Sequence, residues 1–344
     1  MPMDDPVSRA ISALAEREDL PASLAVQAFG QVMAGEATPV QTAALLVALR
    51  VKGETAPELE GAALALRAAM MRVDPGTSER LVDTCGTGGG AGTFNISTAA
   101  AFVAAGAGAR VAKHGNRSFT SRSGSADVLE SLGMKIELEP AAAARVLQRC
   151  GMTFLFAPLY HPAMRHVGPV RRELGLSTIM NLLGPLANPA GATRQVIGVA
   201  SPARAPLLAQ TLALLGAERA FVVHAPVGLD EIAPPGLGHT DIHEVRHGSV
   251  ERWTFDPGRF GLAVGDAADL AGGSPDDNAR IVTGILGGAD RTVRRSAVVI
   301  NAAAALVAAG VAEGWEEAVR RSGESLDSGA ATGVLERLRR ESRL

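Results

Sequence analysis

The chain contains 344 residues, of which 47% are hydrophobic and 20% are charged, and its formal net charge is −3. This length allows a large hydrophobic core and exceeds that of one ordinary domain, so we expect two domains. The balanced charge excludes the global basic field of a dedicated nucleic-acid binder, and an aromatic content of 3% argues against base-stacking surfaces.

Residues 5–73 have the pattern of a helical domain. Val7, Ile11 and Leu14 recur at helical spacing, and Asp5 followed by Pro6 is a typical helix start. Further helices are predicted at 21–33, 39–51 and 57–71, each opening at a proline. The sequence Asp-Pro-Gly-Thr-Ser at 74–78 has the composition of a linker. We therefore expect a helical domain at 1–73 and a second domain at 74–344.

Short apolar runs alternate with helical segments after residue 79. The runs lie at 80–84, 109–112, 134–138, 152–156, 195–200 and 220–224. Such alternation is typical of an α/β domain with a mostly parallel sheet and helices on both faces. A polar, proline-containing helical segment at 161–183 interrupts it, and we expect part of 161–187 to join the N-terminal helices.

Three features bear on the location of the protein in the cell. Two cysteines, Cys85 and Cys150, cannot form a disulfide framework. The N-terminus lacks the positively charged segment and apolar run of a signal peptide. The most apolar stretch, 297–311, contains Asn301 and is shorter than the ~20 residues that cross a bilayer. These features predict a soluble, cytoplasmic protein with neither membrane nor nucleic acid as a partner.

The first predicted strand leads into a glycine-rich loop at 85–93. Glycines allow backbone amides to close on an anion, and the start of the following helix adds positive potential. The pattern suits a phosphate or pyrophosphate, and a plain strand–helix turn is the alternative. The loop also matches a dinucleotide fingerprint nominally, but the acid expected about 20 residues later to bind the ribose is absent.

Polar residues follow two other predicted strands. Residues 113–125 combine cations, amides and hydroxyls at a strand end, which is where open α/β sheets bind ligands. Beside the glycine-rich loop, this segment would complete a polyanion site. Asp230 and Glu231 follow a third strand, and such a pair could hold Mg²⁺ if phosphates supply its other oxygen ligands. A solvated acidic turn is the alternative.

Two other patterns carry less weight. His239, His243 and His247 have the helical spacing of a metal site. However, the sequence Thr-Asp-Ile-His-Glu-Val at 240–245 alternates like a strand, which would separate the histidines onto different faces. Cys85 borders the glycine-rich loop, and we interpret it as a small buried thiol.

In order and over almost the whole chain, the motifs closely resemble those of the anthranilate phosphoribosyltransferase family. They are Gly-Thr-Gly-Gly at 86–89, Phe-Asn-Ile-Ser-Thr at 94–98, Lys-His-Gly-Asn-Arg-Ser at 113–118, Ser-Gly-Ser-Ala-Asp at 123–127, His-Pro-Ala-Met at 161–164, Gly-Pro-Val-Arg at 168–171, Asn-Leu-Leu-Gly-Pro-Leu-Ala-Asn-Pro at 181–189, Asp-Glu at 230–231 and Asn-Ala-Ala at 301–303. The resemblance implies a homodimer formed through a small all-helical N-terminal domain, which packs on a larger α/β domain with a mostly parallel sheet. The implied reaction, in tryptophan biosynthesis, transfers the phosphoribosyl group of phosphoribosyl pyrophosphate to the amine of anthranilate and releases pyrophosphate.

The resemblance also implies the site, position by position. The implied contacts of phosphoribosyl pyrophosphate are Gly86, Gly89, Gly90, Thr93, Asn95, Ile96, Ser97, Thr98, Lys113, His114, Gly115, Asn116, Arg117, Ser118, Phe119, Thr120, Ser121 and Ser125. Gly86, Asn116 and Arg171 match anthranilate contacts, and Ser97, Asp230 and Glu231 match Mg²⁺ ligands. No general acid or base is assigned, because an aromatic amine is already a neutral nucleophile. The loop departs from the family at Gly90-Ala-Gly-Thr93, which is one residue shorter and lacks the usual Asp.

Two alternatives share this architecture. A pyrimidine nucleoside phosphorylase would bind inorganic phosphate and a nucleoside, and it would not need Asp230 and Glu231 to hold a magnesium pyrophosphate. A non-catalytic relative could bind nucleic acid, although the net charge of −3 and the intact acidic pair count against it. Asn116 and Arg171 favour an aromatic carboxylate over a pyrimidine.

Overall fold

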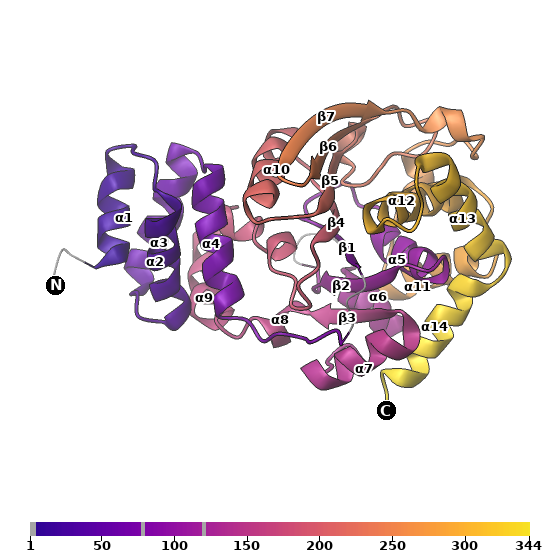
Figure 1. The fold of residues 1–344 in the computed structure, drawn as a ribbon, viewed down its shortest axis with the longest axis horizontal. Coiled ribbons are helices and arrows are strands. Elements are labelled where there is room, and N and C mark those ends of the chain that lie inside the picture. Colours follow the sequence, from indigo (N-terminus) through magenta and orange to yellow (C-terminus); the bar gives the residue numbers. More distant parts are fainter. Residues whose placement is uncertain (1–4, 77–79, 119–121) are drawn as a thin grey trace.

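Within the described residues of the computed structural model, 5–76, 80–118 and 122–344, four helices form the N-terminal body (Figure 1). They are α1 (Pro6–Ala15), α2 (Ala22–Ala34), α3 (Pro39–Lys52) and α4 (Ala56–Ala68). The Asp5 carboxylate accepts hydrogen bonds of 3.1 Å from the amides of Val7 and Ser8, which confirms the predicted start of the first helix. Gly61 allows α4 to approach α2 closely, because a Cβ at this position would lie 2.5 Å from the Cβ of Ala25.

A segment from the middle of the chain packs against this body. Helix α9 (Met164–Leu174) contacts α2 and α3. Val167 of α9 shares a buried core with Leu45 and Leu49 of α3. The hydrophobic core of the helical body therefore includes residues that lie beyond residue 73 in the sequence. The predicted linker at 74–78 lies partly outside the described residues.

The second body is built on a sheet whose seven strands, among the described residues, follow the order β3-β2-β1-β4-β5-β6-β7. They are β1 (Leu81–Gly86), β2 (Arg110–Gly115), β3 (Met152–Phe156), β4 (Arg194–Gly198), β5 (Arg219–His224), β6 (Thr240–Arg246) and β7 (Ser249–Phe255). The pairs from β3 to β5 are parallel, and β6 and β7 are antiparallel. This confirms the predicted mostly parallel sheet. β7 escaped prediction because most of its side chains are exposed, so it lacks an apolar run.

The predicted strand at 134–138 is wrong. Met134, Ile136 and Leu138 are buried in alternation, but no strand pairs with them in the described structure. Their segment lies instead beside the C-terminal helix, where the Lys135 amide donates to Ser342 Oγ at 3.2 Å. Alternating burial therefore arose here from packing alone, without a sheet partner.

The remaining helices cover both faces of the sheet (Figure 1). They are α5 (Ile96–Gly106), α6 (Ser125–Ser131), α7 (Pro140–Cys150), α8 (Ala157–Tyr160), α10 (Ala205–Leu214), α11 (Pro275–Leu286), α12 (Val293–Ala309), α13 (Trp315–Asp327) and α14 (Ala330–Glu341). On one face, Val196 and Phe221 join the core that includes α5 and α12. On the other, Ile197 and Val222 join the core shared by α10 and the helical body. In the described part of the chain, no helix is both long and apolar enough to cross a membrane.

The strand order reverses direction between β1 and β4. From β1 the chain adds β2 and β3 on one side of the sheet, and it then returns to place β4 on the other side. The loops that leave β1 and β4 therefore diverge to opposite faces and open a crevice at their carboxyl ends. This crevice is the place in the fold where a ligand site is expected.

Candidate active site

The carboxyl ends of β1 and β4 coincide at this crevice. Gly86, the last residue of β1, is in register with Gly198, the last residue of β4. The amide of Thr87 donates to the Gly198 carbonyl at 2.9 Å and anchors the start of the glycine-rich loop. The ends of β2 and β5 border the same crevice. The three polar segments predicted from the sequence are thereby brought to one edge of the sheet.

The glycine-rich loop is held by its backbone on both sides. The Ala91 amide donates to Gly228 O at 3.0 Å, and Gly92 O accepts from the Gly272 amide at 2.9 Å. Gly88 and Gly89 have φ angles of 72° and 82°, a conformation that favours glycine. The loop is therefore shaped by backbone contacts, which leave a surface of amides rather than side chains.

The acidic pair lies directly against this loop. A Cβ at Gly90 would collide with the Asp230 carboxylate, and a Cβ at Gly198 would collide with the Asp230 backbone. Burial raises the pKa of Asp230 and of Glu231, and the Asp230 charge raises that of Glu231 further. The structure thus holds two neighbouring carboxyl groups in a place poorly reached by water, where each disfavours the charged form of the other.

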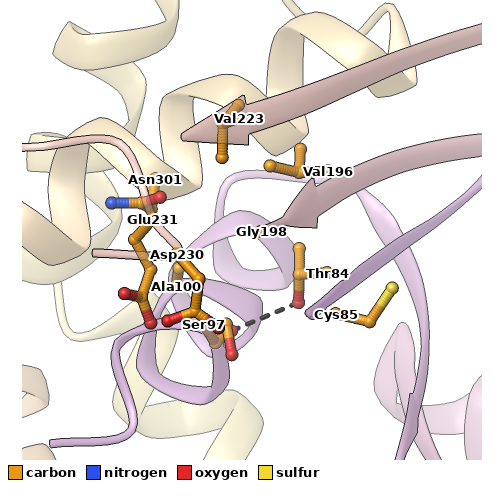
Figure 2. A pocket seen from close by; sticks show the side chains of 10 residues that line it. All are labelled: Thr84, Cys85, Ser97, Ala100, Val196, Gly198, Val223, Asp230, Glu231 and Asn301. Atoms are coloured by element: carbon orange, nitrogen blue, oxygen red, sulfur yellow. Dashed lines mark hydrogen bonds between the residues drawn. The ribbon is translucent and has the colours of Figure 1, made fainter. Parts of the chain in front are cut away.

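These carboxylates have the donor set for a hard divalent cation. Figure 2 shows Asp230 and Glu231 beside the hydroxyl of Ser97 in a small pocket between β1, β4 and α12. Glu231 Oε2 is buried without a hydrogen-bond partner. Among the described residues, no group of three or more His, Cys, Asp or Glu could form an all-protein cage. Two carboxylates and a hydroxyl nevertheless fit Mg²⁺, which usually takes one or two carboxylates and completes its shell with water and phosphate oxygens.

A buried lysine supplies positive charge beside the pair. Lys113 is 1% exposed, and its ammonium group donates to the Thr84 carbonyl and lies 3.4 Å from Ser97 Oγ. Burial lowers the pKa of Lys113, and the charges of Asp83 and Glu231 oppose that shift. A cation and two carboxylates therefore share one low-dielectric site.

Asp83 is a site residue that the sequence analysis missed. It is fully buried, and it accepts hydrogen bonds from the His114 amide at 3.1 Å and from Asn188 Nδ2 at 2.8 Å. Burial raises its pKa to about 6, although Lys113 favours its charged form. A lone carboxylate inside the apolar run at 80–84 was the available signal.

Two histidines beside the strand ends are neutral. His114 Nδ1 lies 3.1 Å from the Gly184 carbonyl, and its Nε2 lies 3.2 Å from Nε2 of His161. Because a carbonyl only accepts, His114 carries its proton on Nδ1 and presents Nε2 as an acceptor to His161. Burial lowers the pKa of His114 to about 3 and that of His161 to about 4. At neutral pH, neither ring supplies a cation to the site.

Two implied contacts at the start of α5 are buried, and a third is held by neighbouring loops. Asn95 donates to the Ser123 carbonyl at 3.1 Å and accepts from Asn278 Nδ2 at 2.8 Å, so its side chain ties neighbouring loops together. Ile96 and Thr98 are fully buried. The Ile96 amide donates to the Phe94 carbonyl at 2.7 Å and the Thr98 amide to the Asn95 carbonyl at 3.1 Å, so neither backbone amide is free to bind a ligand in this structure.

The segment after β2 forms ion pairs and hydrogen bonds with the helix that follows it, α6. Arg117 forms ion pairs with Asp127 and Glu130 of α6, and the Ser118 amide donates to Asp127 at 3.1 Å. Ser125 donates to the Asn116 carbonyl at 3.3 Å and closes the segment. The implied contacts Phe119, Thr120 and Ser121 lie outside the described residues.

Arg171 lies away from this edge, on α9 of the helical body. It forms no ion pair or side-chain hydrogen bond within the described residues, including with Glu173 two positions along the chain. Burial lowers the pKa of its guanidinium. Arg171 is thus a half-buried cation that still has its hydrogen-bonding capacity to offer.

Asn301 is a second residue whose role the sequence did not reveal. It sits within the apolar helix α12, and its side chain accepts from the Ile232 amide at 3.0 Å and donates to the Ile232 carbonyl at 2.9 Å. These paired bonds fix the backbone immediately after Glu231. A single amide in an apolar helix was the signal, but its partner is 69 residues away in the chain.

Comparisons with known proteins agree with this arrangement. Residues 8–70 match the helical bundle domain of a glycosyl transferase family, and residues 78–332 match its a/b domain. An anthranilate phosphoribosyltransferase of Anaeromyxobacter dehalogenans is 52% identical over 333 residues, which cover 96% of this chain and 97% of that protein.

Solved structures extend the likeness to three dimensions. Anthranilate phosphoribosyltransferase from Thermus thermophilus is 42% identical, with a TM-score of 0.91 over 97% of this chain and 99% of its own. The Saccharomyces cerevisiae enzyme in complex with phosphoribosyl pyrophosphate and Mg is 28% identical, with a TM-score of 0.89 over 99% of this chain and 98% of that one. On this agreement of sequence, fold and length, the chain belongs to the anthranilate phosphoribosyltransferase family.

Proposed function

We propose that the protein transfers the phosphoribosyl group of phosphoribosyl pyrophosphate to the amine of anthranilate, releasing pyrophosphate, as a step of tryptophan biosynthesis in the cytoplasm. The observation that carries this proposal is the buried site at the ends of β1 and β4. There a backbone-lined loop, one ammonium group and two adjacent carboxylates face one another. This combination suits a magnesium-bound pyrophosphate better than it suits a lone phosphate.

The chain's own groups would bind the leaving pyrophosphate. Backbone amides of the glycine-rich loop would donate hydrogen bonds to it, and Lys113 adds a full charge. Asp230, Glu231 and Ser97 would hold Mg²⁺, which when bound neutralises negative charge on the departing group. Because these donors are held in place by the fold, little reorganisation is needed as charge develops.

The acceptor side needs orientation rather than activation. The amine of anthranilate is neutral and attacks the anomeric carbon as the bond to pyrophosphate breaks, so no strong base is required. Arg171 would bind the anthranilate carboxylate through its planar guanidinium, with Asn116 and Gly86 on the opposite side. Positioning of the two substrates then supplies much of the rate acceleration.

This assignment places the two substrates on different parts of the chain. Arg171 lies on the helical body, whereas Gly86 and Asn116 lie at the sheet edge. We therefore also propose a functional division into a helical domain at 1–73, joined by part of 161–187, and a phosphoribosyl pyrophosphate-binding domain at 74–344. Anthranilate would bind where the two meet.

A homodimer through the helical domain forms part of the same proposal. Helix α3 buries Leu45 and Leu49 on one side, yet Val40 and Val51 on the other are 78% and 68% exposed. Ala44 and Val47 continue this outer stripe at helical spacing. A second copy of the same stripe would cover these valines in a two-fold interface.

Replacement of the acidic pair tests the pyrophosphate site. In Asp230→Asn with Glu231→Gln, turnover measured by loss of anthranilate fluorescence should fall at least ~100-fold, the scale of one lost electrostatic stabiliser. The melting temperature without Mg²⁺ should stay equal or rise, because two buried ionisable groups that disfavour each other's charge are removed. Glu251→Gln is the control: it makes the same change at an exposed glutamate of β7, and turnover should stay unchanged. Near-normal turnover in the double variant would reduce the pair to a structural turn.

Replacement of Arg171 tests acceptor recognition. A charge-assisted hydrogen bond contributes about 1.5–3 kcal/mol, so Arg171→Ala should lower kcat/KM by roughly 10- to 150-fold. The loss should lie mainly in KM for anthranilate, since the carboxylate keeps its charge throughout the reaction. Steady-state kinetics with each substrate varied in turn would measure both KM values. Arg172→Ala, an exposed neighbour, should be mild, and the assignment fails if it is the more damaging change.

Replacement of the outer valines of α3 tests the dimer. Light scattering should give the mass of two chains for the unmodified protein. Val40→Glu combined with Val51→Glu should give the mass of one, because each interface would then bury charge. Val264→Glu is the matched control, since this valine is 73% exposed but lies far along the chain in the second body. A monomeric unmodified protein, or a variant that stays dimeric, would contradict the proposed interface.

A further inference from the structure

A second cavity lies at the opposite edge of the sheet from the candidate active site. It has a volume of about 130 Å³ and borders Gln195, the second residue of β4, and Ala217, which precedes β5. The candidate active site lies at the carboxyl ends of the same strands. The cavity is therefore separated from the crevice by the length of the strands.

Two bodies meet at this cavity. Arg67 and Met70 come from the end of α4 and the residues after it, whereas Leu212 and Leu215 come from the end of α10. The segment that crosses between the bodies supplies Pro185 to its wall. A molecule in the cavity would contact both bodies at once.

The charged residues that line the cavity are all positive. Arg67 and Arg72 line it, and in the described structure no Asp or Glu does. Arg67 Nε donates to the Leu186 carbonyl at 2.6 Å, but neither guanidinium forms an ion pair among the described residues. Burial lowers the pKa of Arg67, and the neighbouring charge of Arg72 lowers it further. Arg67 is half-buried and has no charged partner in the described structure, so its remaining guanidinium donors are available to an anion.

Nearby polar groups do not supply a negative partner for these arginines. Gln195 donates to the Pro185 carbonyl at 2.6 Å, and Glu218 just outside the lining accepts from Thr193 and Arg194 at 2.9 Å. Asn188, a further polar lining residue, donates to Asp83 and to the Ala112 carbonyl at 2.8 Å. The apolar part of the wall consists of Met70, Ala192, Leu212, Leu215 and Ala217. A bare inorganic ion would leave this wall facing empty space or water.

We propose that the cavity binds a small organic anion, with one carboxylate or phosphate group held between Arg67 and Arg72 and a short apolar body against Leu212, Leu215 and Met70. Such a ligand joins the helical body to the sheet body and stabilises one placement of the two. None of its residues belongs to the proposed substrate or Mg²⁺ contacts, although Asn188 of its lining also donates to Asp83.

Calorimetric titration of the full-length protein tests this site with three probes: hexanoate, phenyl phosphate and uncharged hexanol. Hexanoate or phenyl phosphate should bind at one site per chain, and the tighter of the two identifies the preferred head group. Arg72→Met should weaken that binding by about 10-fold or more, because it removes one charged donor and keeps an apolar side chain. Arg67→Met should do the same. Arg72 is the cleaner test because it is exposed and, in the described part of the chain, forms no hydrogen bond to the backbone.

Two control variants locate the binding. Arg246→Met, an exposed arginine at the end of β6, should leave the affinity unchanged. Arg171→Met should also leave it unchanged, which separates this cavity from the proposed anthranilate site. The proposal is overturned if hexanol binds as tightly as hexanoate, if Arg171→Met rather than Arg72→Met removes the binding, or if neither anion binds at millimolar concentration.

Discussion

Two carboxylates and one ammonium group are held out of water at the strand ends. The rest of the site compensates for the free energy that their burial costs. Charged groups lose hydration on burial, and neighbouring carboxylates also repel each other. The fold supports Asp230 through the glycines at 90 and 198 and fixes the following backbone through Asn301. Such an arrangement lowers the stability of the empty protein, and it is explained by a ligand that supplies the missing opposite charge.

The segment at 184–188 links this charged site to the helical body. Gly184 accepts from His114, Leu186 accepts from Arg67 of α4, and Asn188 donates to Asp83 and to the Ala112 carbonyl. One short stretch thus binds β1, β2 and α4 together. The same stretch borders the arginine-lined cavity through Pro185 and Asn188. Movement of the helical body relative to the sheet would therefore be transmitted to His114 and Asp83 at the strand ends.

Sequence reasoning predicted the parts of the fold that depend on local pattern. The proline-led helices and the strands β1 to β5 follow from periodicity and boundaries within a few residues. It failed at 134–138, where burial alternates without a partner strand. Within the site, motif order located the loops, but Asp83 pairs with Asn188 across 105 residues, and no local pattern specifies such a partner. The internal bonds of Asn95 and Arg117 likewise required coordinates.

Transfer of a phosphoribosyl group to anthranilate is the activity on which every role assigned to this site depends. The most direct measurement mixes the purified protein with phosphoribosyl pyrophosphate, anthranilate and Mg²⁺, and follows anthranilate fluorescence together with released pyrophosphate. The account predicts that fluorescence falls in step with pyrophosphate release, and that omission of either substrate or of Mg²⁺ stops both. Release of pyrophosphate without loss of anthranilate, or cleavage of a pyrimidine nucleoside by inorganic phosphate in its place, would contradict it.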